Sequence, residues 1–415
     1  MLGIMKLLLE KELDMNNFSK ITGVLYAADM TGGVDHSPES LPIYQTTAFT
    51  SRSLDEVIER YELIDDEQAY SYYRSSNPNR ASAGHTISYL ENGDATLVCS
   101  SGMAAICGTL MTFLNKGDHI VYSNCCYGET LEIMTERLEH WGIEVTPVNI
   151  NDLDEVKAAL RPNTKIIYTE VVANPLMRVA DIDTLAQWAH DRNAYLIVDN
   201  TFTSPFAFRP IEHGADIVIN SLTKFLNGHS DACAGSITSR KDIIDKLNPM
   251  IQHFGTPADP FTSWLVTRSL KTANLRIIKQ MSNAAKLAKA LEKHRHIIEV
   301  FHPCIESFAD HKTAIKLWGE DKDEEMCGML SIVVDSEDYD KRNQFVKNLQ
   351  FVRYAPTLGG IRTTFQQPVY SSQAHMPDAE RRKIGITPAM FRISVGIEDI
   401  DDLINEFDNA LKAFD

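Results

Sequence analysis

Two short apolar runs, each leading into a chemically reactive polar residue, constrain the fold of this chain more than any other feature. Residues 196–199 read Leu-Ile-Val-Asp, and residues 215–224 read Ala-Asp-Ile-Val-Ile-Asn-Ser-Leu-Thr-Lys. Runs of this length and composition are typical of buried parallel strands. Because the carboxyl ends of strands in an open α/β sheet face the ligand crevice, we expect Asp199 and Lys224 to point into one site.

An acid and a lysine placed in this way suit pyridoxal 5'-phosphate. This cofactor requires a lysine amine for its covalent attachment and an acid that keeps its ring nitrogen protonated, so that the ring can withdraw electrons. Ser221 and Thr223 lie two residues apart on an extended segment, where both hydroxyls can reach the cofactor phosphate. The alternative is that Asp199 caps a helix and Lys224 lies on the surface, since single acids and lysines are usually solvated.

Strand and helix patterns alternate along the middle of the chain, which predicts βαβ units and a mostly parallel sheet. The predicted strands cover residues 95–99, 119–122, 144–148 and 165–170, and the predicted helices cover residues 130–140, 153–160 and 182–192. A long helical region is predicted from about Pro260 to His294 as the connection to a C-terminal domain. That domain has predicted strands at 330–334 and 391–395 and a closing helix at 401–414.

The N-terminal part carries few periodic signals. Residues 16–60 are predicted to form an irregular arm that lies on another subunit or on the next domain. Charged residues interrupt the leucines of residues 1–14, so we expect a dispensable helix there and no secretory signal. The predicted organisation is an arm over 1–75, a cofactor-binding domain over 76–275 and a C-terminal domain over 276–415.

Length and composition narrow the class of protein. A chain of 415 residues exceeds one typical core, which favours two domains. The net charge of −17 argues against a nucleic-acid partner, because binding to phosphates requires clustered basic residues. The seven cysteines are an odd number without C-x-x-C spacing, so we predict no metal site, no disulfide framework and a reducing, cytoplasmic location. No apolar run is long enough to span a bilayer, so no membrane partner is expected.

Two further segments are candidates for binding a phosphate. The loop at 70–80 contains Tyr72 and Arg74, and a guanidinium matches the geometry of phosphate. The turn Ser101-Gly102-Met103 leads from a strand into a helix, whose first backbone N–H groups are free to bind an anion. An ordinary surface loop and a tightly packed turn without a ligand are the alternatives.

Three single residues complete the list of candidates. Tyr127 follows a predicted strand, where its ring can stack on a flat cofactor, although a buried structural tyrosine is the commoner case. Asn174 also follows a strand and can donate to a ring oxygen, but Asn-Pro is also a common turn signal. Arg392 alternates with apolar residues on a strand and suits a substrate carboxylate; a solvated strand face explains it equally well.

These motifs occur in an order that resembles the Cys/Met metabolism (trans-sulfuration) family of pyridoxal-phosphate enzymes, from about Leu41 to the C-terminus. The family includes cystathionine γ-synthase, cystathionine γ- and β-lyases, methionine γ-lyase and O-acetylhomoserine sulfhydrylase. The resemblance implies an α/β, type I (aspartate-aminotransferase-like) fold, with a large, mostly parallel sheet and a smaller C-terminal α+β domain. It also implies a homotetramer built from two catalytic dimers.

The same resemblance assigns roles to individual residues. Lys224 is implied to carry the cofactor, Asp199 to hold its ring nitrogen, and Tyr127 to stack on the ring. Asn174 is implied to bond the ring hydroxyl, and Arg392 with Thr357 to receive the substrate carboxylate. The implied phosphate contacts come from Ser101, Gly102, Met103, Ser221 and Thr223, and from Tyr72 and Arg74 of the neighbouring subunit.

Three departures from the family pattern bear on the substrate. Glu129 stands where methionine γ-lyases have a cysteine and many cystathionine enzymes a glycine. Pro356 replaces a glutamate expected to hold the distal amino group of cystathionine, and Arg362 replaces another glutamate. Glu129 would suit a substrate with a cationic tail; equally, an acid in the first helical turn is stabilised by the helix dipole.

The leading functional prediction is a lyase that eliminates the γ-substituent of a sulfur-containing or homoserine-type amino acid and yields 2-oxobutanoate and ammonia. The alternatives are a γ-replacement transferase and a β-lyase acting on cystathionine. A non-catalytic regulator that binds the cofactor is a further alternative, against which the joint presence of Lys224, Asp199, Tyr127 and Arg392 argues.

Overall fold

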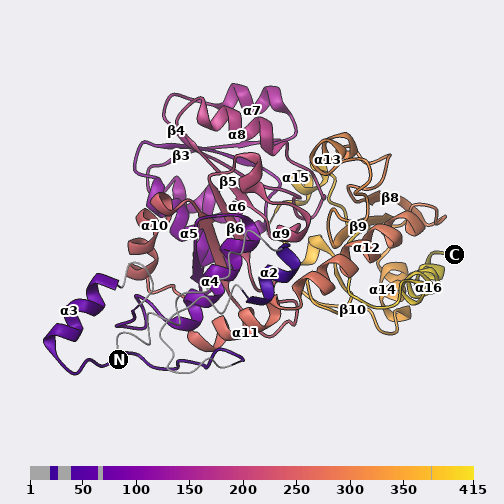
Figure 1. The fold of residues 1–415 in the computed structure, drawn as a ribbon. Coiled ribbons are helices and arrows are strands. Elements are labelled where there is room, and N and C mark those ends of the chain that lie inside the picture. The colour runs from indigo at the N-terminus through magenta and orange to yellow at the C-terminus, as the bar shows by residue number, and fades with distance from the viewer. Residues whose placement is uncertain (1–18, 27–38, 64–68, 375) are drawn as a thin grey trace.

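The computed structural model describes residues 19–26, 39–63, 69–374 and 376–415. Two sheets organise the chain: a seven-stranded sheet in the large domain and a five-stranded sheet in the smaller C-terminal domain. In Figure 1 the C-terminal elements gather to one side of the large domain. The prediction for residues 1–14 falls outside the described residues.

The large sheet is mostly parallel, as predicted, and its order is β1-β7-β6-β5-β4-β2-β3. Five neighbouring strands from β6 to β3 run parallel, while β7 pairs antiparallel with both β1 and β6. The strands are β1 (Ala95–Cys99), β2 (His119–Ser123), β3 (Glu144–Val148), β4 (Thr164–Glu170), β5 (Tyr195–Asp199), β6 (Ile217–Ser221) and β7 (Gly235–Ser239). The sequence patterns missed β7.

Helices cover both faces of this sheet, so its central strands are apolar at consecutive positions rather than at alternate ones. Leu196 and Val198 of β5 pack into the same core as α4 and α8, whereas Ile197 packs into a second core with α5 and α10. The helices of this domain are α4 (Pro78–Glu91), α5 (Gly102–Phe113), α6 (Gly128–Glu132), α7 (Leu153–Ala159), α8 (Ile182–His190), α9 (Ser204–Ala207), α10 (Lys241–His253) and α11 (Pro260–Leu270).

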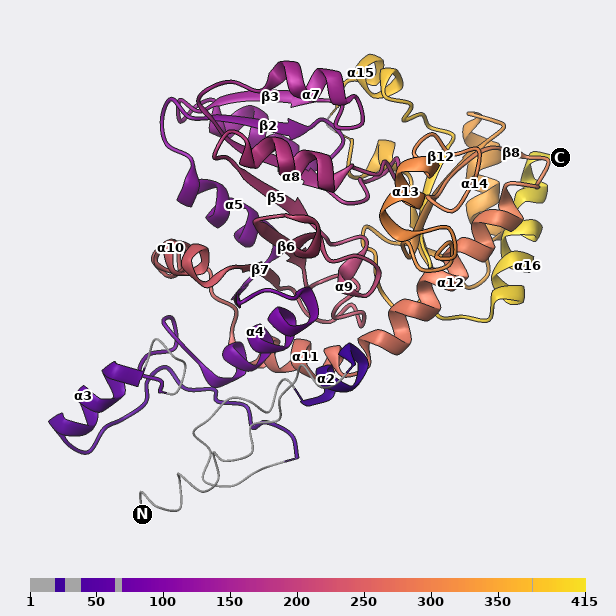
Figure 2. The ribbon, with the colours of Figure 1, turned by 45° about the horizontal axis from the view of Figure 1, so that its top comes forward.

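The long helix α12 (Ala273–Leu291) runs from the large domain into the smaller one (Figure 2). The predicted boundary between residues 275 and 276 lies inside its first turn. The second sheet has the order β10-β11-β12-β9-β8 and is antiparallel except between β10 and β11. Its elements are β8 (Ile297–Phe301), α13 (His311–Trp318), β9 (Met329–Val334), α14 (Tyr339–Asn348), β10 (Arg353–Tyr354), β11 (Thr364–Gln366), α15 (Asp378–Lys383), β12 (Met390–Ser394) and α16 (Ile400–Leu411).

The region predicted as helical over 260–294 is divided into two helices, because α11 ends at Leu270 and α12 begins at Ala273. Arg276 accounts for the break. Its buried guanidinium donates to the backbone oxygens of Ser269, Phe225 and Leu226, at 3.0–3.1 Å. The bond to Ser269 O satisfies a carbonyl near the end of α11, which in a continuous helix would accept a hydrogen bond from the next turn.

Two other predictions need correction. The segment predicted as a helix over 130–140 begins as α6 and continues as a π-helix over Ile133–Leu138. The N-terminal arm is not irregular throughout, since it contains α2 (Lys20–Tyr26) and α3 (Leu54–Leu63). No residue of α3 is buried, and in Figure 2 this helix projects away from the large domain.

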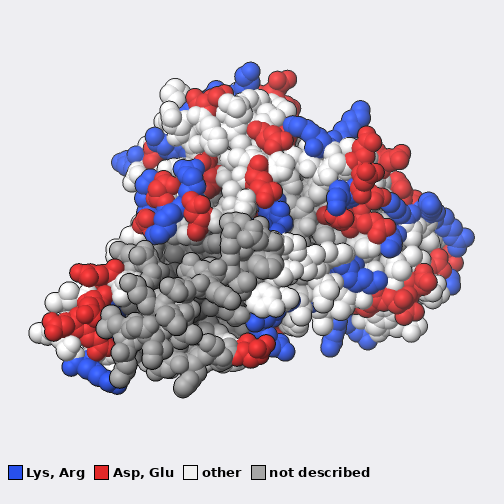
Figure 3. Space-filling view, viewed as in Figure 1, with Lys and Arg blue, Asp and Glu red and all other residues white. Residues whose placement is uncertain are grey.

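Within the described residues, no helix is long and apolar enough to cross a membrane. On the face shown in Figure 3, acidic and basic side chains are interspersed over both domains.

Candidate active site

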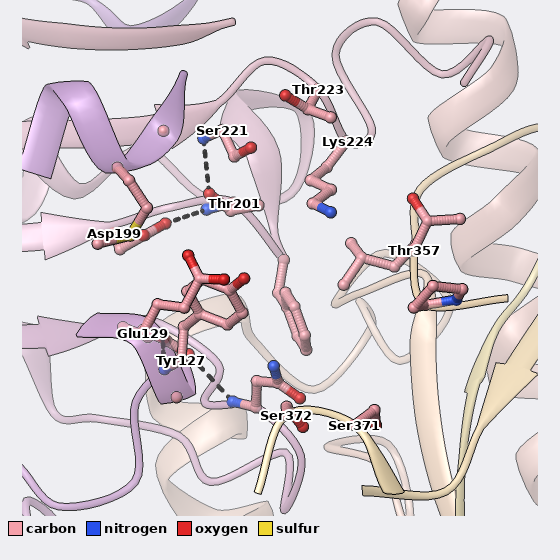
Figure 4. Close-up of a pocket in the computed structure, with 18 of the residues that line it drawn as sticks. Tyr127, Glu129, Asp199, Thr201, Ser221, Thr223, Lys224, Thr357, Ser371 and Ser372 are labelled. Atoms are coloured by element: carbon pink, nitrogen blue, oxygen red, sulfur yellow. Dashed lines mark hydrogen bonds between the residues drawn. The ribbon is translucent and has the colours of Figure 1, made fainter. Parts of the chain in front are cut away.

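A cavity of about 580 Å³ opens where β4, β5 and β6 end, and the C-terminal domain closes its other side. The large domain contributes strand-end residues and the N-termini of α5 and α6. The C-terminal domain contributes residues 356–358, 366, 371–372 and 392. Figure 4 shows these two groups facing each other across an open centre.

Lys224 lies in the turn that follows β6, and its amine points into the open centre of the cavity (Figure 4). The turn is fixed by two backbone bonds: Lys224 N donates to Ser221 O at 3.1 Å, and Gly228 N donates to Lys224 O at 2.7 Å. Burial lowers the pKa of the amine, and the nearby Arg392 guanidinium lowers it further. A lowered pKa increases the fraction of neutral amine, the form that acts as a base or a nucleophile.

Asp199 ends β5, lines the same cavity and is buried. One carboxylate oxygen accepts a hydrogen bond from Thr201 N at 2.9 Å, and the Thr201 hydroxyl accepts one from Ser221 N at 2.8 Å (Figure 4). Burial raises the pKa of Asp199. A cationic group bound in the cavity would therefore stabilise its charged form.

The N-terminus of α5 provides a place for an anion. Ser101 caps the helix by accepting from Ala104 N at 3.0 Å, and the N–H groups of Gly102 and Met103 precede the first internal helical bonds. A Cβ atom at Gly102 would lie 3.0 Å from Ser221 Cβ. A side chain at this position would therefore be tight against β6, and the close approach brings the Ser221 hydroxyl beside the helix N-terminus.

The Thr223 hydroxyl also lines the cavity, but the backbone of Ala234 holds it. It donates to Ala234 O at 3.2 Å and accepts from Ala234 N at 3.1 Å. Its hydrogen is therefore used within the protein, whereas an oxygen lone pair remains for a ligand.

Tyr127 stands at the N-terminus of α6, with its ring on the cavity wall beside Glu129 (Figure 4). Burial raises the pKa of its phenol to about 12, and the charge of Glu129 and a hydrogen bond to it add to the rise. The phenol therefore keeps its proton at neutral pH. Glu132, one turn further along the same helix, also lines the cavity.

Arg392 is 3% exposed and lies at the centre of a polar cluster, so the prediction of a solvated strand face is excluded for it. Its Nη1 donates to Asn174 Oδ1 at 2.9 Å, and its Nη2 donates to Thr357 O at 3.3 Å. With its amide oxygen turned toward the guanidinium, Gln366 accepts from both nitrogens at 2.8 Å. Three predicted residues, Asn174, Thr357 and Arg392, are thus brought together.

Glu170 is a site residue that the sequence patterns did not single out. It ends β4, and the sheet register places it next to Asp199. Burial and the neighbouring Asp199 raise the pKa of Glu170, while hydrogen bonds from the backbone of Tyr127 and Asn174 lower it. A polar residue at the end of an apolar strand was the signal, as it was for Asp199. Gln366, Ser371 and Ser372 were also missed, and they had no comparable signal.

Three residues discussed from the sequence lie outside this cavity. Tyr72 is 49% exposed, and Arg74 is exposed and donates to Gln252 O at 3.0 Å. Both positions are compatible with contact to a neighbouring subunit. Arg362 is exposed on the loop that follows Gly360, so its replacement of the family glutamate adds no charge to the cavity wall.

The groups around the cavity match the chemistry of pyridoxal phosphate. An amine with a lowered pKa, a buried acid and an anion site at a helix N-terminus line the same cavity. The cradle between Gly102 and Ser221 leaves little space for an extra carbon and exposes N–H and O–H donors. Fold and site together define a pyridoxal-phosphate enzyme with a type I, aspartate-aminotransferase-like fold.

The chain belongs to the Cys/Met metabolism family of PLP-dependent enzymes, whose model matches residues 24–412. It is 34% identical over 376 residues to an L-methionine γ-lyase of Fusobacterium nucleatum subsp. polymorphum, covering 90% of this chain and 93% of that one. It is 36% identical to a cystathionine γ-lyase of Bacillus subtilis, covering 94% and 98%. A solved Campylobacter jejuni structure, described as an O-acetylhomoserine (thiol)-lyase with N'-pyridoxyl-lysine-5'-monophosphate, has a TM-score of 0.86 and 30% identity and covers 95% and 100%.

Proposed function

We propose that this protein is a lyase that eliminates the γ-substituent of a sulfur-containing or homoserine-type amino acid, releasing 2-oxobutanoate and ammonia. One observation carries the proposal: the same cavity holds a base and an acid. Lys224 offers an amine with a lowered pKa, and Tyr127 offers a phenol that keeps its proton up to about pH 12. Both methionine and cystathionine γ-lyases are among the similar proteins.

We assign the cofactor contacts as follows. Lys224 attaches the cofactor covalently, Asp199 bonds its ring nitrogen, Tyr127 stacks on its ring and Asn174 bonds its ring hydroxyl. When bound, the cofactor supplies an electron sink for charge that develops on the substrate. The phosphate is held by Ser101, Gly102, Met103, Ser221 and Thr223, and by Tyr72 and Arg74 from the neighbouring subunit.

The remaining work falls to side chains of this chain. Arg392, fixed by Asn174 and Gln366, holds the substrate carboxylate together with Thr357. The freed amine of Lys224 takes the proton from Cα and then moves protons at Cβ, which γ-elimination requires. Tyr127 donates its proton to the departing sulfur or oxygen. Together with burial, the positive charge of Arg392 lowers the pKa of the Lys224 amine and so favours its neutral form.

A second substrate class is favoured by the two acids of α6. Glu129 and Glu132 both line the cavity, three residues apart on the same helix face. They suit a substrate whose γ-substituent ends in an ammonium group, as that of cystathionine does. In this second proposal, Glu129 supplies the carboxylate that other family members have at the position of Pro356, but it does so from another side of the cavity.

We further propose a cytoplasmic homotetramer built from two catalytic dimers. The arm supports this assembly, because α3 buries no residue within its own chain and leaves Leu54 81% exposed. All seven cysteines are free thiols, which suits a reducing compartment. Light scattering of the purified protein measures the assembly, and a monomer would contradict it.

A product assay tests the function. The purified, cofactor-loaded protein is incubated with methionine, homocysteine, cystathionine, O-acetylhomoserine or a cationic γ-substituted analogue, and the keto acid is identified. 2-Oxobutanoate formed without an added thiol supports the γ-lyase and names its substrate. Pyruvate alone would make the protein a β-lyase. Turnover that requires an added thiol would make it a γ-replacement transferase.

A further inference from the structure

We propose that Glu170 is a positioning residue whose carboxylate fixes both sides of the active site by holding the backbone of Tyr127 and of Asn174. The inference rests on the proposed function for the roles of those two residues. It goes beyond that function because it concerns a residue that touches neither substrate nor cofactor in the assigned scheme.

The geometry is that of one carboxylate shared between two loops. Glu170 Oε1 accepts from Tyr127 N at 2.6 Å, and Glu170 Oε2 accepts from Asn174 N at 3.0 Å. Tyr127 lies at the start of α6, 43 residues before Glu170 in the sequence, whereas Asn174 lies only four residues after it. The carboxylate therefore ties together the segments that follow β2 and β4, two strands that are neighbours in the sheet but are separated in the chain by β3.

Each of the two bonds leads to a group at the reacting centre. The Tyr127 bond holds the N-cap residue of α6, and thereby the place of the phenol and of Glu129 beside it. The Asn174 bond orients a residue whose Oδ1 accepts from Arg392 Nη1 at 2.9 Å. One hydrogen bond thus joins Glu170 to Tyr127, the proposed acid. Through Asn174, two hydrogen bonds join it to Arg392, the proposed binder of the substrate carboxylate.

A carboxyl group suits this place because each of its oxygens has a lone pair for one N–H group, whether or not the group carries a proton. A glutamine of the same shape has only one such oxygen, and its NH₂ group would face the second N–H donor. Glu170→Gln therefore breaks one of the two bonds without removing bulk. Glu170→Asp keeps both acceptor oxygens, but its side chain is one methylene shorter, so the oxygens lie further from the two N–H donors.

Glu406 offers a matched control. It is also 6% exposed, and its carboxylate accepts from the backbone N–H groups of Gln350, Phe351 and Val352 at 2.5–3.2 Å. It lies on α16 and does not line the cavity. Glu406→Gln makes the same chemical change to a buried acid at a place remote from the site.

The experiment compares the cofactor-loaded wild type with Glu170→Gln, Glu170→Asp and Glu406→Gln. Steady-state kinetics give kcat and KM for the best substrate, and thermal unfolding gives stability. A spectral titration with glycine, an unreactive amino acid, measures carboxylate binding at the bound cofactor. This titration does not depend on which reaction the enzyme catalyses.

We expect Glu170→Gln to weaken glycine binding about 10-fold and to lower kcat by a similar factor, because the groups it positions move by a fraction of an ångström. Glu406→Gln is expected to leave glycine binding and kcat within about 2-fold of the wild type, because its three donors all bond to one oxygen, which the amide keeps. If Glu170→Gln does not fold, Glu170→Asp is expected to show the same two losses at smaller size.

Wild-type glycine binding and kcat in a folded Glu170→Gln variant, or in Glu170→Asp where only that variant folds, would overturn the inference. Equal losses in Glu406→Gln would also overturn it, since they would show a general effect of stability. A wild type that forms no 2-oxobutanoate but binds glycine would refute the proposed function and leave the Glu170 comparison intact.

Discussion

Gly359 provides a test of how tightly the C-terminal domain positions the lysine. Its φ of +79° is in the left-handed region, and a Cβ atom there would lie 2.4 Å from Phe225 N and 2.7 Å from Lys224 C. Ordinary contacts begin near 3.4 Å, so Gly359→Ala requires the two segments to separate by about 1 Å. The colliding atoms belong to the backbone of the lysine turn and have no rotamer by which to escape.

The loop that contains Gly359 is itself anchored. Gly359 N donates to Ser394 Oγ at 2.8 Å, and Gly360 O accepts from Gln280 Nε2 at 2.8 Å. If the lysine turn moves, kcat falls, because a misplacement of about 1 Å can cost on the order of 100-fold in rate. If the loop moves instead, Thr357 is displaced from Arg392, and KM rises.

Gly385→Ala is the matched control, because Gly385 has φ +87° and a Cβ atom there would have no neighbour within 4 Å. Both variants carry the left-handed strain, about 1–2 kcal/mol, which thermal unfolding measures. Only Gly359→Ala is expected to change kcat/KM, by about 100-fold, in steady-state kinetics of the cofactor-loaded enzyme. Equal kcat/KM values in the two variants would refute the reasoning that this glycine holds the lysine in place.

Four further substitutions test individual groups. Lys224→Ala is expected to abolish turnover and the yellow colour of the bound cofactor; an active, yellow variant would contradict the assignment. Asp199→Ala should lose activity mainly because the cofactor ring withdraws electrons less strongly without this acid, and a wild-type rate would count against that role. Glu129→Gln removes a charge that raises the pKa of Tyr127, so the alkaline limb of the kcat–pH profile should move to lower pH; an unmoved limb would show that Tyr127 is not the acid. Burial raises the pKa of Glu91 from 4.5 to about 7, so the folded state binds a proton that the unfolded chain has released. Between these pH values the free energy of unfolding should fall by roughly 3 kcal/mol more in the wild type than in Glu91→Gln, as denaturant titrations would show.

The strand-end residues could be predicted from the sequence because their signal is local. An apolar run of buried-strand length fixes where β5 and β6 end, and the sheet geometry then places Asp199 and Lys224 at one edge. Glu170 ends β4 in the same way, so the same rule applied to every strand would have found it. The resemblance to the family added Thr357, which no periodic pattern marks.

Apart from Arg392 and Thr357, the C-terminal wall of the cavity could not be predicted, because its position depends on contacts between distant segments. Gln366 binds Arg392 from the neighbouring strand β11, and Ser372 reaches the site because its carbonyl packs on Gly128, where a Cβ atom would lie 2.2 Å away. The break between α11 and α12 has a similar origin, since Arg276 bonds to backbone oxygens about 50 residues away. Such partners are set by the packed fold rather than by the residues beside them.

The neighbours of the site residues along the chain face away from the cavity, and they explain how the site residues are held in place. Asn200 follows Asp199 and Asn220 precedes Ser221, and both amides donate to the buried carboxylate of Glu91, at 3.1 and 2.7 Å. Because side chains alternate along an extended chain, each residue that faces the cavity has a neighbour that faces the protein interior. The two sets cannot exchange faces without a shift of register, which would put the amides into the cavity and leave Glu91 buried without its donors. The acid and the serine of the site are therefore fixed by the same strand geometry that buries Glu91.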